Sequence, residues 1–398
     1  MSKTPKLRFK EFSGDWEQKK LGDECNFFSG GTPLTTNRSY YDGNIPFIRS
    51  AELSEYTTEL KISQDGLNNS SAKLVQKGDL LYALYGATSG AVSISKIDGA
   101  INQAILCIKS DNINLEFLEK ILIKNKENII KTYLQGGQGN LSSNIIKGLK
   151  YNLPSKEEQE KIASFLSLID DKISLQGEKV EALKDYKKGM MQKIFSRKLR
   201  FKDDDGRDYP EWEEKKLNEI LLERKEKNNG NLRVCSVAVR KGVIDQIEHL
   251  GRSFAAKDTS NYNLVKYGDI IYTKSPTGDF PYGIIKQSFL NENVVVSPLY
   301  GVFKPLNFNL GYILHCYFYY RENTNNYLYS IIQKGAKNTI NITNTTFLSK
   351  SLILPIDENE QMKIAKLFIE LDNKINKEQE KLDYLNEYKK GLLQQMFV

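Results

Sequence analysis

The chain has 398 residues, which exceeds one ordinary domain core and predicts at least two domains. Its composition, 40% hydrophobic and 27% charged, is typical of an ordered soluble protein, and no apolar run approaches the roughly 20 residues of a membrane span. The net charge of +7 is compatible with a polyanionic partner but is too modest to identify one.

The N-terminal residues MSKTPKLRFKEF lack the apolar stretch of a secretory signal. The four cysteines stand far apart and form no C-x-x-C pair, which is unlike a disulfide framework or a metal site. They are Cys25, Cys107, Cys235 and Cys316. We therefore expect a cytoplasmic protein with incidental cysteines and no membrane partner.

A segment near the N-terminus is repeated near the middle of the chain. KLRFKEFSGDWEQKKL begins at Lys6, and KLRFKDDDGRDYPEWEEKKL, which carries four additional residues, begins at Lys198. Internal repetition is the sequence sign of a duplicated architecture. Each unit is therefore predicted to span about half of the chain.

The stretches after these repeats, residues 22–150 and 218–350, share little beyond a general strand pattern. Short apolar runs separated by Gly-, Asn- and Ser-rich turns predict a small α+β globule in each. KGDLLYAL, from Lys77, corresponds to YGDIIYTK, from Tyr267, and both predict a Gly-Asp turn before a buried strand. The predicted strands are Ile45–Ile48, Asp79–Leu84, Ala100–Ile108, Leu232–Val239, Asp269–Lys274 and Val294–Phe303.

Each half ends in a segment that predicts a long amphipathic helix. EQEKIASFLSLIDDKI, from Glu158, corresponds to EQMKIAKLFIELDNKI, from Glu360, and DYKKGMMQKIF corresponds to EYKKGLLQQMF at the same offset of 202 residues. Apolar residues recur at spacings of four and three, as in a heptad seam. Polar residues interrupt the seam at matching positions, namely Gln176, Lys187, Glu378 and Lys389.

Two arrangements of these helices are open. Each helix could simply pack on its own globule. One chain with two copies of a seam can also close it as an antiparallel pair related by a pseudo-twofold axis, and this is the arrangement we predict. The polar interruptions would then fix the register. Val398 should lie near Lys6, because the same helix end in the first half runs directly into SRKLRF.

This order of globule and heptad helix, with EQ-x-KIA opening each helix and YKKG-x-x-Q-x-x-F closing it, resembles the specificity subunits of type I restriction-modification systems over essentially the whole chain. The resemblance implies an α+β fold of two α/β target-recognition domains separated by two long heptad helices that form an intramolecular antiparallel coiled coil, a pseudo-twofold repeat. The implied recognition domains are residues 1–154 and 198–355, and the implied spacer helices are residues 155–197 and 356–398.

The resemblance also implies a function. Each globule would read one half of a split site in double-stranded DNA, while the helices would set the gap and dock two methyltransferase subunits, through which restriction/translocase subunits join. Two different globules on a pseudo-twofold frame predict a bipartite, asymmetric target with half-sites about one helical turn (~10 bp) apart. This chain would bind no cofactor itself, whereas the partner methyltransferase would use S-adenosylmethionine and the partner restriction subunit ATP and Mg.

Candidate DNA contacts lie on small, polar, Gly-rich loops, because hydrogen-bonding side chains on loops can reach base edges. Taken alone, each such loop is more often an ordinary surface turn. In the first globule the candidates are Thr32, Thr35, Thr36, Asn37, Arg38, Arg49, Tyr85, Thr88, Ser89, Gln138 and Asn140. In the second globule they are Arg240, Lys241, Lys274, Ser275, Thr277, Lys334, Lys337 and Asn338.

A basic stretch, Lys187–Lys202, suits DNA phosphates across the spacer or an acidic face of a partner. A charged helix exterior explains it equally well. The candidates here are Lys187, Lys188, Lys193, Arg197, Lys198 and Arg200. Asn102 and Gln103 fall within a predicted strand, so we interpret them as edge polar residues rather than contacts.

Catalytic motifs are missing from the sequence. It contains no Pro-Pro dipeptide, and hence no Asn/Asp-Pro-Pro-aromatic motif, and no G-x-x-x-x-G-K-[ST] loop. Neither His249 nor His315 has a neighbour at metal-ligand spacing. We therefore expect neither catalysis nor a metal site in this chain. The alternatives are a coiled-coil assembly scaffold with two ligand-binding globules, which would be insensitive to DNA sequence, and a self-contained nuclease or methyltransferase, which would act without partners.

Overall fold

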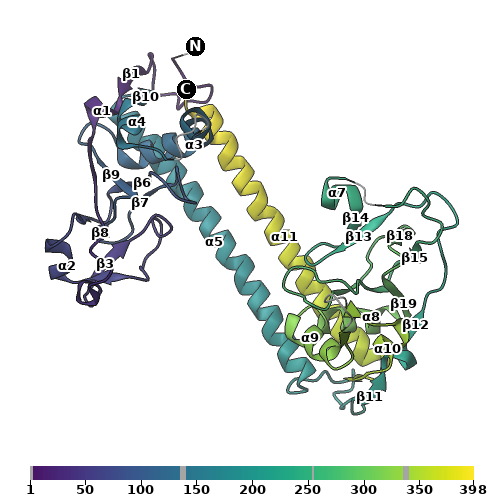
Figure 1. The fold of residues 1–398 in the computed structure, drawn as a ribbon. Helices are drawn as coiled ribbons and strands as arrows, with labels where there is room; N and C mark the ends of the chain where they lie inside the picture. The colour runs from purple at the N-terminus through teal and green to yellow at the C-terminus, as the bar shows by residue number, and fades with distance from the viewer. Residues whose placement is uncertain (1–2, 135–139, 253–254, 335–339) are drawn as a thin grey trace. The chain divides into compact units, whose positions relative to one another are not determined.

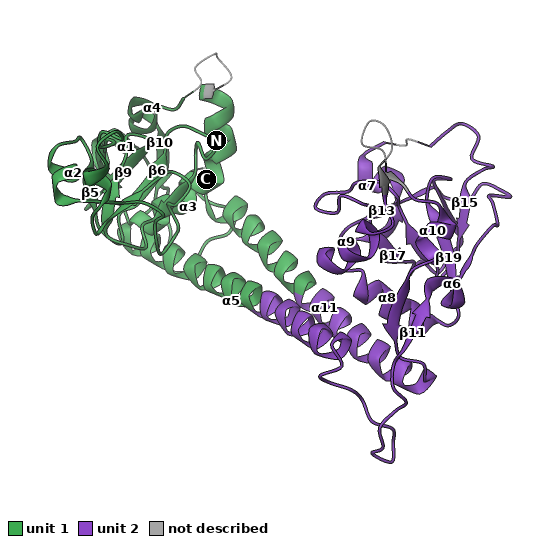
Figure 2. Ribbon diagram, turned by 60° about the horizontal axis from the view of Figure 1, so that its bottom comes forward, with its two compact units in different colours: residues 1–178, 379–398 green, residues 179–378 purple. Residues whose placement is uncertain are grey.

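A computed structural model describes residues 3–134, 140–252, 255–334 and 340–398 of the chain (Figure 1). The chain divides into two compact units (Figure 2). Unit 1 comprises residues 1–178 and 379–398, and unit 2 comprises residues 179–378. Each unit therefore contains one globule together with part of each long helix. No helix in the described part of the chain is both long and apolar enough to cross a membrane.

Unit 1 is built on a four-stranded antiparallel sheet with the order β2-β9-β6-β7. These strands are β2 (Asn26–Ser29), β9 (Ile105–Lys109), β6 (Leu80–Ala83) and β7 (Val92–Ile94). A second sheet contains β4 (Lys61–Ile62), β3 (Ile45–Ile48), β8 (Gly99–Ile101) and β5 (Lys73–Val75), and β1 (Glu17–Lys20) pairs with β10 (Lys150–Leu153).

The core beside the first sheet of unit 1 contains residues of the helices α1 (Leu21–Glu24), α3 (Leu115–Leu134) and α4 (Ser143–Gly148). The helices η1 (Arg38–Tyr41) and α2 (Gln64–Asn68) pack beside the second sheet. Phe117 and Leu122 of α3 are fully buried in one cluster with Leu80 and Leu106 of the sheet. Burial of this apolar area on one face of the sheet leaves the loops at its edges on the surface.

Unit 2 repeats this architecture on a sheet with the order β12-β19-β16-β17. Its strands are β12 (Leu221–Glu223), β19 (Gly301–Pro305), β16 (Ile270–Tyr272) and β17 (Ile285–Gln287). The other described strands of unit 2 form four antiparallel pairs. They are β11 (Glu213–Lys216) with β22 (Ser351–Leu354), β13 (Cys235–Ala238) with β14 (Gly242–Asp245), β15 (Asn263–Val265) with β18 (Val294–Val296), and β20 (Gln333–Lys334) with β21 (Ile340–Asn341). Its helices are α6 (Leu217–Ile220), α7 (Gln246–Leu250), α8 (Phe308–Tyr317), α9 (Arg321–Tyr329) and α10 (Asn344–Leu348).

The two Gly-Asp turns have the same structure in both units. Asp79 accepts a hydrogen bond from the backbone N–H of Gln76 at 2.8 Å, and Asp269 accepts one from Lys266 at 2.8 Å. The glycine before each aspartate has a positive φ, 97° and 84°, which favours glycine there. The predicted strands that follow these turns are present as β6 and β16.

Two predicted strands are each divided by a turn. The run Ala100–Ile108 contains β8 and β9, and the run Val294–Phe303 contains β18 and β19. The side chain of Asn102 accepts a hydrogen bond from the backbone N–H of Ala104 at 3.0 Å, which stabilises the turn between β8 and β9. The interpretation of Asn102 and Gln103 as residues within a strand is therefore wrong.

The long helices are α5 (Lys156–Phe195) and α11 (Glu358–Met396), and they pair antiparallel within each unit. In unit 1 the first part of α5 shares a core with the last part of α11. In unit 2 the last part of α5 shares a core with the first part of α11. The seam residues in these cores are Ile162, Leu166, Leu392 and Met396 in unit 1 and Ile194, Ile364, Phe368 and Leu371 in unit 2.

Ion pairs replace apolar contacts where the seam is interrupted. Lys187 contacts Asp372 in unit 2, and Lys389 contacts Asp170 in unit 1, each at 2.5 Å. The hydroxyl of Tyr312 also donates to Asp372 at 2.5 Å. Lys187 is buried, and its charge is held by Asp372, which is distant in the sequence. Its assignment as a contact for phosphates or for a partner protein is therefore wrong.

A second pair of equivalent ion pairs fixes the helix starts. Arg8 binds both carboxylate oxygens of Glu158 at 2.8 Å, and Arg200 binds Glu360 at 3.2 and 3.0 Å. Such bidentate pairs are geometrically restrictive. Arg200 also contacts Glu211, so two carboxylates hold the charge that was expected to bind a phosphate or an acidic partner.

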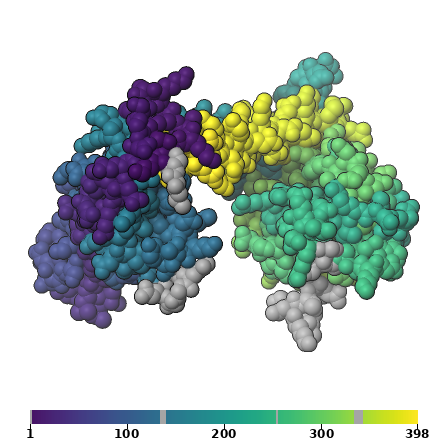
Figure 3. Space-filling view, turned by 90° about the horizontal axis from the view of Figure 1, so that it is seen from above, coloured from purple at the N-terminus to yellow at the C-terminus, as the bar shows by residue number. Residues whose placement is uncertain are grey.

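The N-terminal segment packs against the end of α11, as expected. The backbone N–H of Leu7 donates to the carbonyl of Gln395 at 2.9 Å, and the rings of Trp16 and Phe397 lie 6.5 Å apart. Within unit 2 the equivalent hydrogen bond joins Leu199 to Lys193 at 3.1 Å along the continuous chain. Figure 3 shows the N-terminal segment lying on this end of α11.

Removing the charge of Lys187 is expected to destabilise unit 2. Lys187→Met leaves Asp372 without its cation, at a cost of about 1.5–3 kcal/mol. Lys188→Met, at the exposed neighbouring position, is expected to change the free energy of unfolding by less than about 0.5 kcal/mol. Urea unfolding followed by Trp212 fluorescence in a Trp16→Phe background reports on unit 2. Equal effects of the two substitutions would contradict a register-fixing role for Lys187.

Candidate nucleic-acid interface

Three loops meet at one edge of the first sheet of unit 1. Strand register places Ser29 opposite Leu106, Ala83 opposite Ile105 and Tyr82 opposite Val92. The loop after β2, the loop between β6 and β7 and the turn before β9 therefore emerge together. We call this the loop edge of unit 1.

A side-chain hydrogen bond at this loop edge joins the loop after β2 to the turn before β9. The hydroxyl of Thr32 donates to the amide oxygen of Gln103 at 2.7 Å. Burial raises the pKa of Tyr85, and a hydrogen bond with Gln103 opposes that rise. Thr32 and Gln103 are exposed, and Tyr85 is half-buried. Sequence reasoning assigned Thr32 and Tyr85 to DNA but set Gln103 aside, because its turn lay inside an apolar run.

The loop between β6 and β7 is held by its own hydrogen bonds and by the segment before α4. The carbonyl of Leu84 accepts from the Ser89 hydroxyl at 3.1 Å and from the backbone N–H of Leu141 at 2.9 Å. The Thr88 hydroxyl is buried and has no hydrogen-bond partner among the described residues. Asn140 is exposed beside Leu141.

The remaining candidates of unit 1 fall into different environments. Thr35, Thr36 and Arg38 are exposed, whereas the side chain of Asn37 caps η1 through the backbone N–H of Ser39. Gln138 lies outside the described residues.

Arg49 is held by two carboxylates. Its guanidinium contacts Glu52 at 3.0 Å and Glu59 at 2.5 Å, and hydrogen bonds to Glu52 and then Glu59 raise the pKa of Arg49. These partners contradict the expectation of an available DNA contact.

The loop edge of unit 2 places different side chains on the equivalent strands. Lys274 follows β16 with a φ of 55°, a rare conformation for a residue other than glycine. Burial lowers the pKa of Lys274, and the nearby carboxylate of Glu223, at the end of β12, opposes that effect. Asn344 donates to Glu223 at 2.6 Å. Ser275 and Thr277 belong to the same loop, where the Thr277 hydroxyl donates to the Ser275 carbonyl at 3.1 Å.

The other described candidates of unit 2 belong to two hairpins, β13–β14 and β20–β21. Arg240 and Lys241 are exposed in the turn between β13 and β14, and Lys241 lies 3.6 Å from Glu248. The backbone of Lys334 belongs to β20. Lys337 and Asn338 lie outside the described residues.

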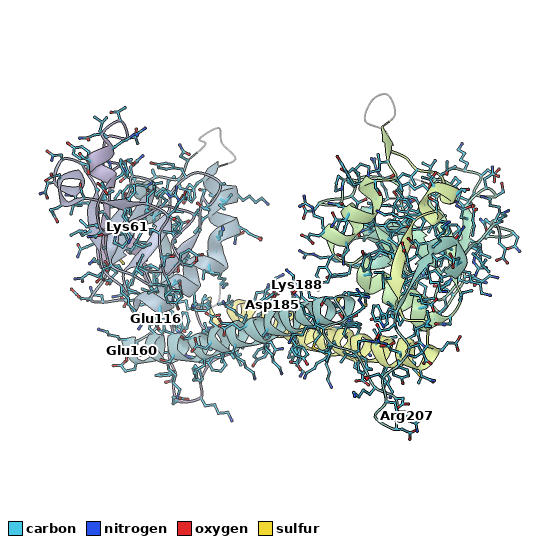
Figure 4. The ribbon with its side chains drawn as sticks, turned by 90° about the horizontal axis from the view of Figure 1, so that it is seen from below. Lys61, Glu116, Glu160, Asp185, Lys188 and Arg207 are labelled. Carbon is cyan, nitrogen blue, oxygen red and sulfur yellow. The ribbon has the colours of Figure 1, made fainter. Side chains whose placement is uncertain are left out.

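Four of the six candidates in the basic stretch are exposed. They are Lys188, Lys193, Arg197 and Lys198. Lys188 lies on α5 near Asp185 (Figure 4), and Arg197 has a φ of 59° just after the helix. These side chains remain available to a polyanion or an acidic protein surface.

The two loop edges offer hydrogen-bond donors and acceptors rather than a chemical centre. Amide, hydroxyl and ammonium groups of this kind suit base edges and phosphates. Among the described residues, no group of three or more His, Cys, Asp and Glu side chains is arranged to hold a metal ion.

Comparison with known protein families identifies the family of the duplicated chain. The family model described as Type I restriction modification DNA specificity domain matches residues 13–185 and again residues 209–387. The chain belongs to this family. The two matches correspond to the two halves of the duplication, and each extends from the globule into a long helix. The suggested resemblance to a type I specificity subunit is thereby confirmed.

Relatives of this chain include two proteins of Methanocaldococcus jannaschii. The Type I restriction enzyme MjaVIII specificity subunit of Methanocaldococcus jannaschii is 27% identical over 54% of this chain and 52% of the relative. The MjaIX specificity subunit of the same organism is 27% identical over 66% of each chain. The matched stretches therefore cover about half to two thirds of these relatives. The crystal structure of a type I S subunit from M. genitalium shares the fold, with a TM-score of 0.62 and 15% identity over 99% of both chains.

A separate cluster of titratable groups is buried in unit 2 of this specificity subunit. Burial, followed by the positive charge of Lys187, lowers the pKa of Lys286 to about 8. Its ammonium lies 4.5 Å from the centre of the Tyr319 ring. Burial and the nearby lysines also hold the pKa of His315 well below its usual range, which suits its Nδ1 as acceptor for the backbone N–H of Gln287 at 3.0 Å. These contacts lie inside the core, so we assign them to structure.

Replacing Lys286 is expected to stabilise unit 2 in a pH-dependent way. The folded-state pKa of about 8 is below the unfolded value of 10.5, so the folded state binds fewer protons and its stability rises with pH over that interval. Lys286→Met should raise the free energy of unfolding by up to roughly 3 kcal/mol at pH 7. The gain should shrink as pH approaches 10.5. A gain that does not change with pH, measured by urea unfolding of both proteins, would contradict a buried charge at Lys286.

Proposed function

We propose that the chain is a sequence-specific DNA-binding subunit in which unit 1 and unit 2 each read one half of a bipartite target. The observation that carries this proposal is the pair of loop edges, which occupy equivalent positions on the corresponding sheets of unit 1 and unit 2 but present different side chains. The loop edge of unit 1 presents a hydroxyl, an amide and a phenol in one cluster. That of unit 2 presents Lys274 beside Glu223. The two half-sites should therefore differ, and the target should be asymmetric.

The paired helices α5 and α11 support separate roles for the two parts of the chain, in which the globules read DNA and the helices set the distance between the half-sites. Ion pairs fix the register of α5 and α11, and a helix of 40 residues is about 60 Å long. We propose that this paired helix sets the gap between half-sites. The exposed residues Lys188, Lys193, Arg197 and Lys198 would contact phosphates or an acidic partner surface.

The same helices also carry apolar side chains that no globule covers. Leu168 and Leu175 of α5 are each 66% exposed, and Tyr384 of α11 is 69% exposed. Large exposed apolar residues on one helical pair are typical of a protein interface. We propose that two methyltransferase subunits dock on the helices and that restriction/translocase subunits join through them.

Chemistry in this proposal belongs to the partners. The methyltransferase would supply S-adenosylmethionine, and the restriction subunit would supply ATP and Mg. The hydrogen-bonding groups described at the loop edges suit recognition, so the chain itself would act without a catalytic residue. We place the assembled complex in the cytoplasm.

The proposal predicts a new bipartite methylated motif in cells that carry this chain with a type I methyltransferase subunit. Long-read methylome sequencing, compared with cells that lack the chain, measures it. Exchanging residues 22–150 for the corresponding globule of another specificity subunit should change one half-site and leave the other unchanged, because the second loop edge is not altered.

Three outcomes would contradict the proposed function. A change in both half-sites would show that the globules do not read independently. A stable complex without any new motif would instead favour the assembly scaffold. Methylation by the chain in the absence of the methyltransferase subunit would favour the self-contained enzyme.

Lengthening both helices together tests the spacing role. One heptad inserted after Glu178 and another after Glu380 lie at equivalent positions, so they preserve the Lys187–Asp372 and Lys389–Asp170 pairs. The insertion adds about 10 Å, or roughly 3 bp. The methylome should show a longer gap, or no motif where the added DNA twist prevents simultaneous reading. An unchanged gap would contradict the spacing role, and a heptad in α5 alone serves as a control that shifts the register.

A further inference from the structure

We infer that Gln103 specifies an adenine in the half-site read by unit 1, an inference that rests on the proposed function. Gln103 is exposed in the turn between β8 and β9, at the loop edge where the β2 and β6–β7 loops also emerge. The Gln103 side chain combines a hydrogen-bond donor and an acceptor in one planar amide group. Such an amide matches the N6 donor and N7 acceptor that adenine presents in the major groove.

The hydrogen bond from Thr32 uses one of the four hydrogen-bonding positions of the Gln103 amide. A glutamine amide has two lone pairs on its oxygen and two N–H donors. The Thr32 hydroxyl donates to one lone pair, at 2.7 Å. The other lone pair and an N–H are the pair of groups that a bidentate contact with adenine uses.

The backbone beneath Gln103 is held firmly. The Asn102 side chain closes the turn through the N–H of Ala104, and the Asn102 carbonyl accepts from the backbone N–H of Gly30 at 3.2 Å. A Cβ atom at Gly30 would lie 1.8 Å from the carbonyl oxygen of Ile101, so only glycine allows the β2 loop to approach so closely. This approach brings Thr32 to Gln103. A side chain positioned before binding loses less conformational entropy on contact.

The equivalent turn of unit 2 lacks this group. Ser297 accepts a hydrogen bond from the backbone N–H of Leu299 at 3.3 Å, as Asn102 does from Ala104. Pro298 then stands at the position of Gln103. Pro298 has no side-chain amide, so this mode of reading is restricted to unit 1. Adenine specificity of this origin should appear in one half-site only.

The test compares methylomes of three variants in the complete complex with a methyltransferase subunit. Exchange of residues 22–150 first shows which half-site belongs to unit 1. Gln103→Leu should lower the preference for adenine over other bases at one position of that half-site by roughly 5- to 150-fold. Gln103→Glu, which can only accept, should shift the preference at the same position towards cytosine. Thr32→Val should weaken the adenine preference less than Gln103→Leu does, because it removes orientation but keeps the amide.

Two internal controls accompany these variants. Gln64→Leu removes an exposed amide on α2 of the same unit, and its motif should remain that of the wild type. The unit 2 half-site should remain intact in all variants, which reports that each protein folds and assembles.

The inference is overturned if Gln103→Leu keeps the wild-type motif with unchanged selectivity, or if the change falls in the unit 2 half-site. It is also overturned if the wild-type half-site of unit 1 contains no A·T pair. Absence of any motif with the wild-type chain would instead mark the failure of the proposed function, so the two failures are distinguishable.

Discussion

Neither long helix can bury its apolar seam within its own half of the sequence, and the rest of the fold depends on this constraint. α5 begins against the end of α11 in unit 1 and ends against the start of α11 in unit 2. Each unit is therefore completed by residues from both halves of the chain. The packing of Trp16 against Phe397 shows how directly the two ends of the sequence depend on each other. This mutual closure explains why the helices and junctions kept their sequence while residues 22–150 and 218–350 diverged.

The charged residues of the seam specify the register rather than add strength. Partly buried ion pairs are often no more stabilising than apolar contacts would be, but they penalise alternatives. A slip of one heptad would separate Lys187 from Asp372 and Lys389 from Asp170 together. An uninterrupted apolar seam would tolerate that slip far better. The interruptions are thus consistent with a helical pair whose length matters to its function.

The duplication made the pairing of the long helices and the contact between the chain ends predictable from the sequence. Local sequence patterns were insufficient to predict the loop structures. Matching seams and junctions at a constant offset indicated the antiparallel closure and the contact between the chain ends. The turn at Asn102 was missed because a single side-chain hydrogen bond divides an otherwise continuous apolar run. Lys187 and Arg200 were assigned to phosphates or to an acidic partner surface because a basic side chain gives no sign of a carboxylate about 160 to 185 residues away in the same chain.

Under the proposed function, the residues that read DNA can vary because they contribute little to the core. Glu158 and Glu360 are nearly fully buried and hold the helix starts, so their loss would leave buried arginine contacts unpaired. Gln103, in contrast, is exposed on a turn whose conformation depends on Asn102 and Gly30. Substitution of such an exposed side chain typically changes stability by less than about 0.5 kcal/mol. Under the proposed function, a new base preference can therefore arise at the loop edge while the long helices and the junctions continue to fold.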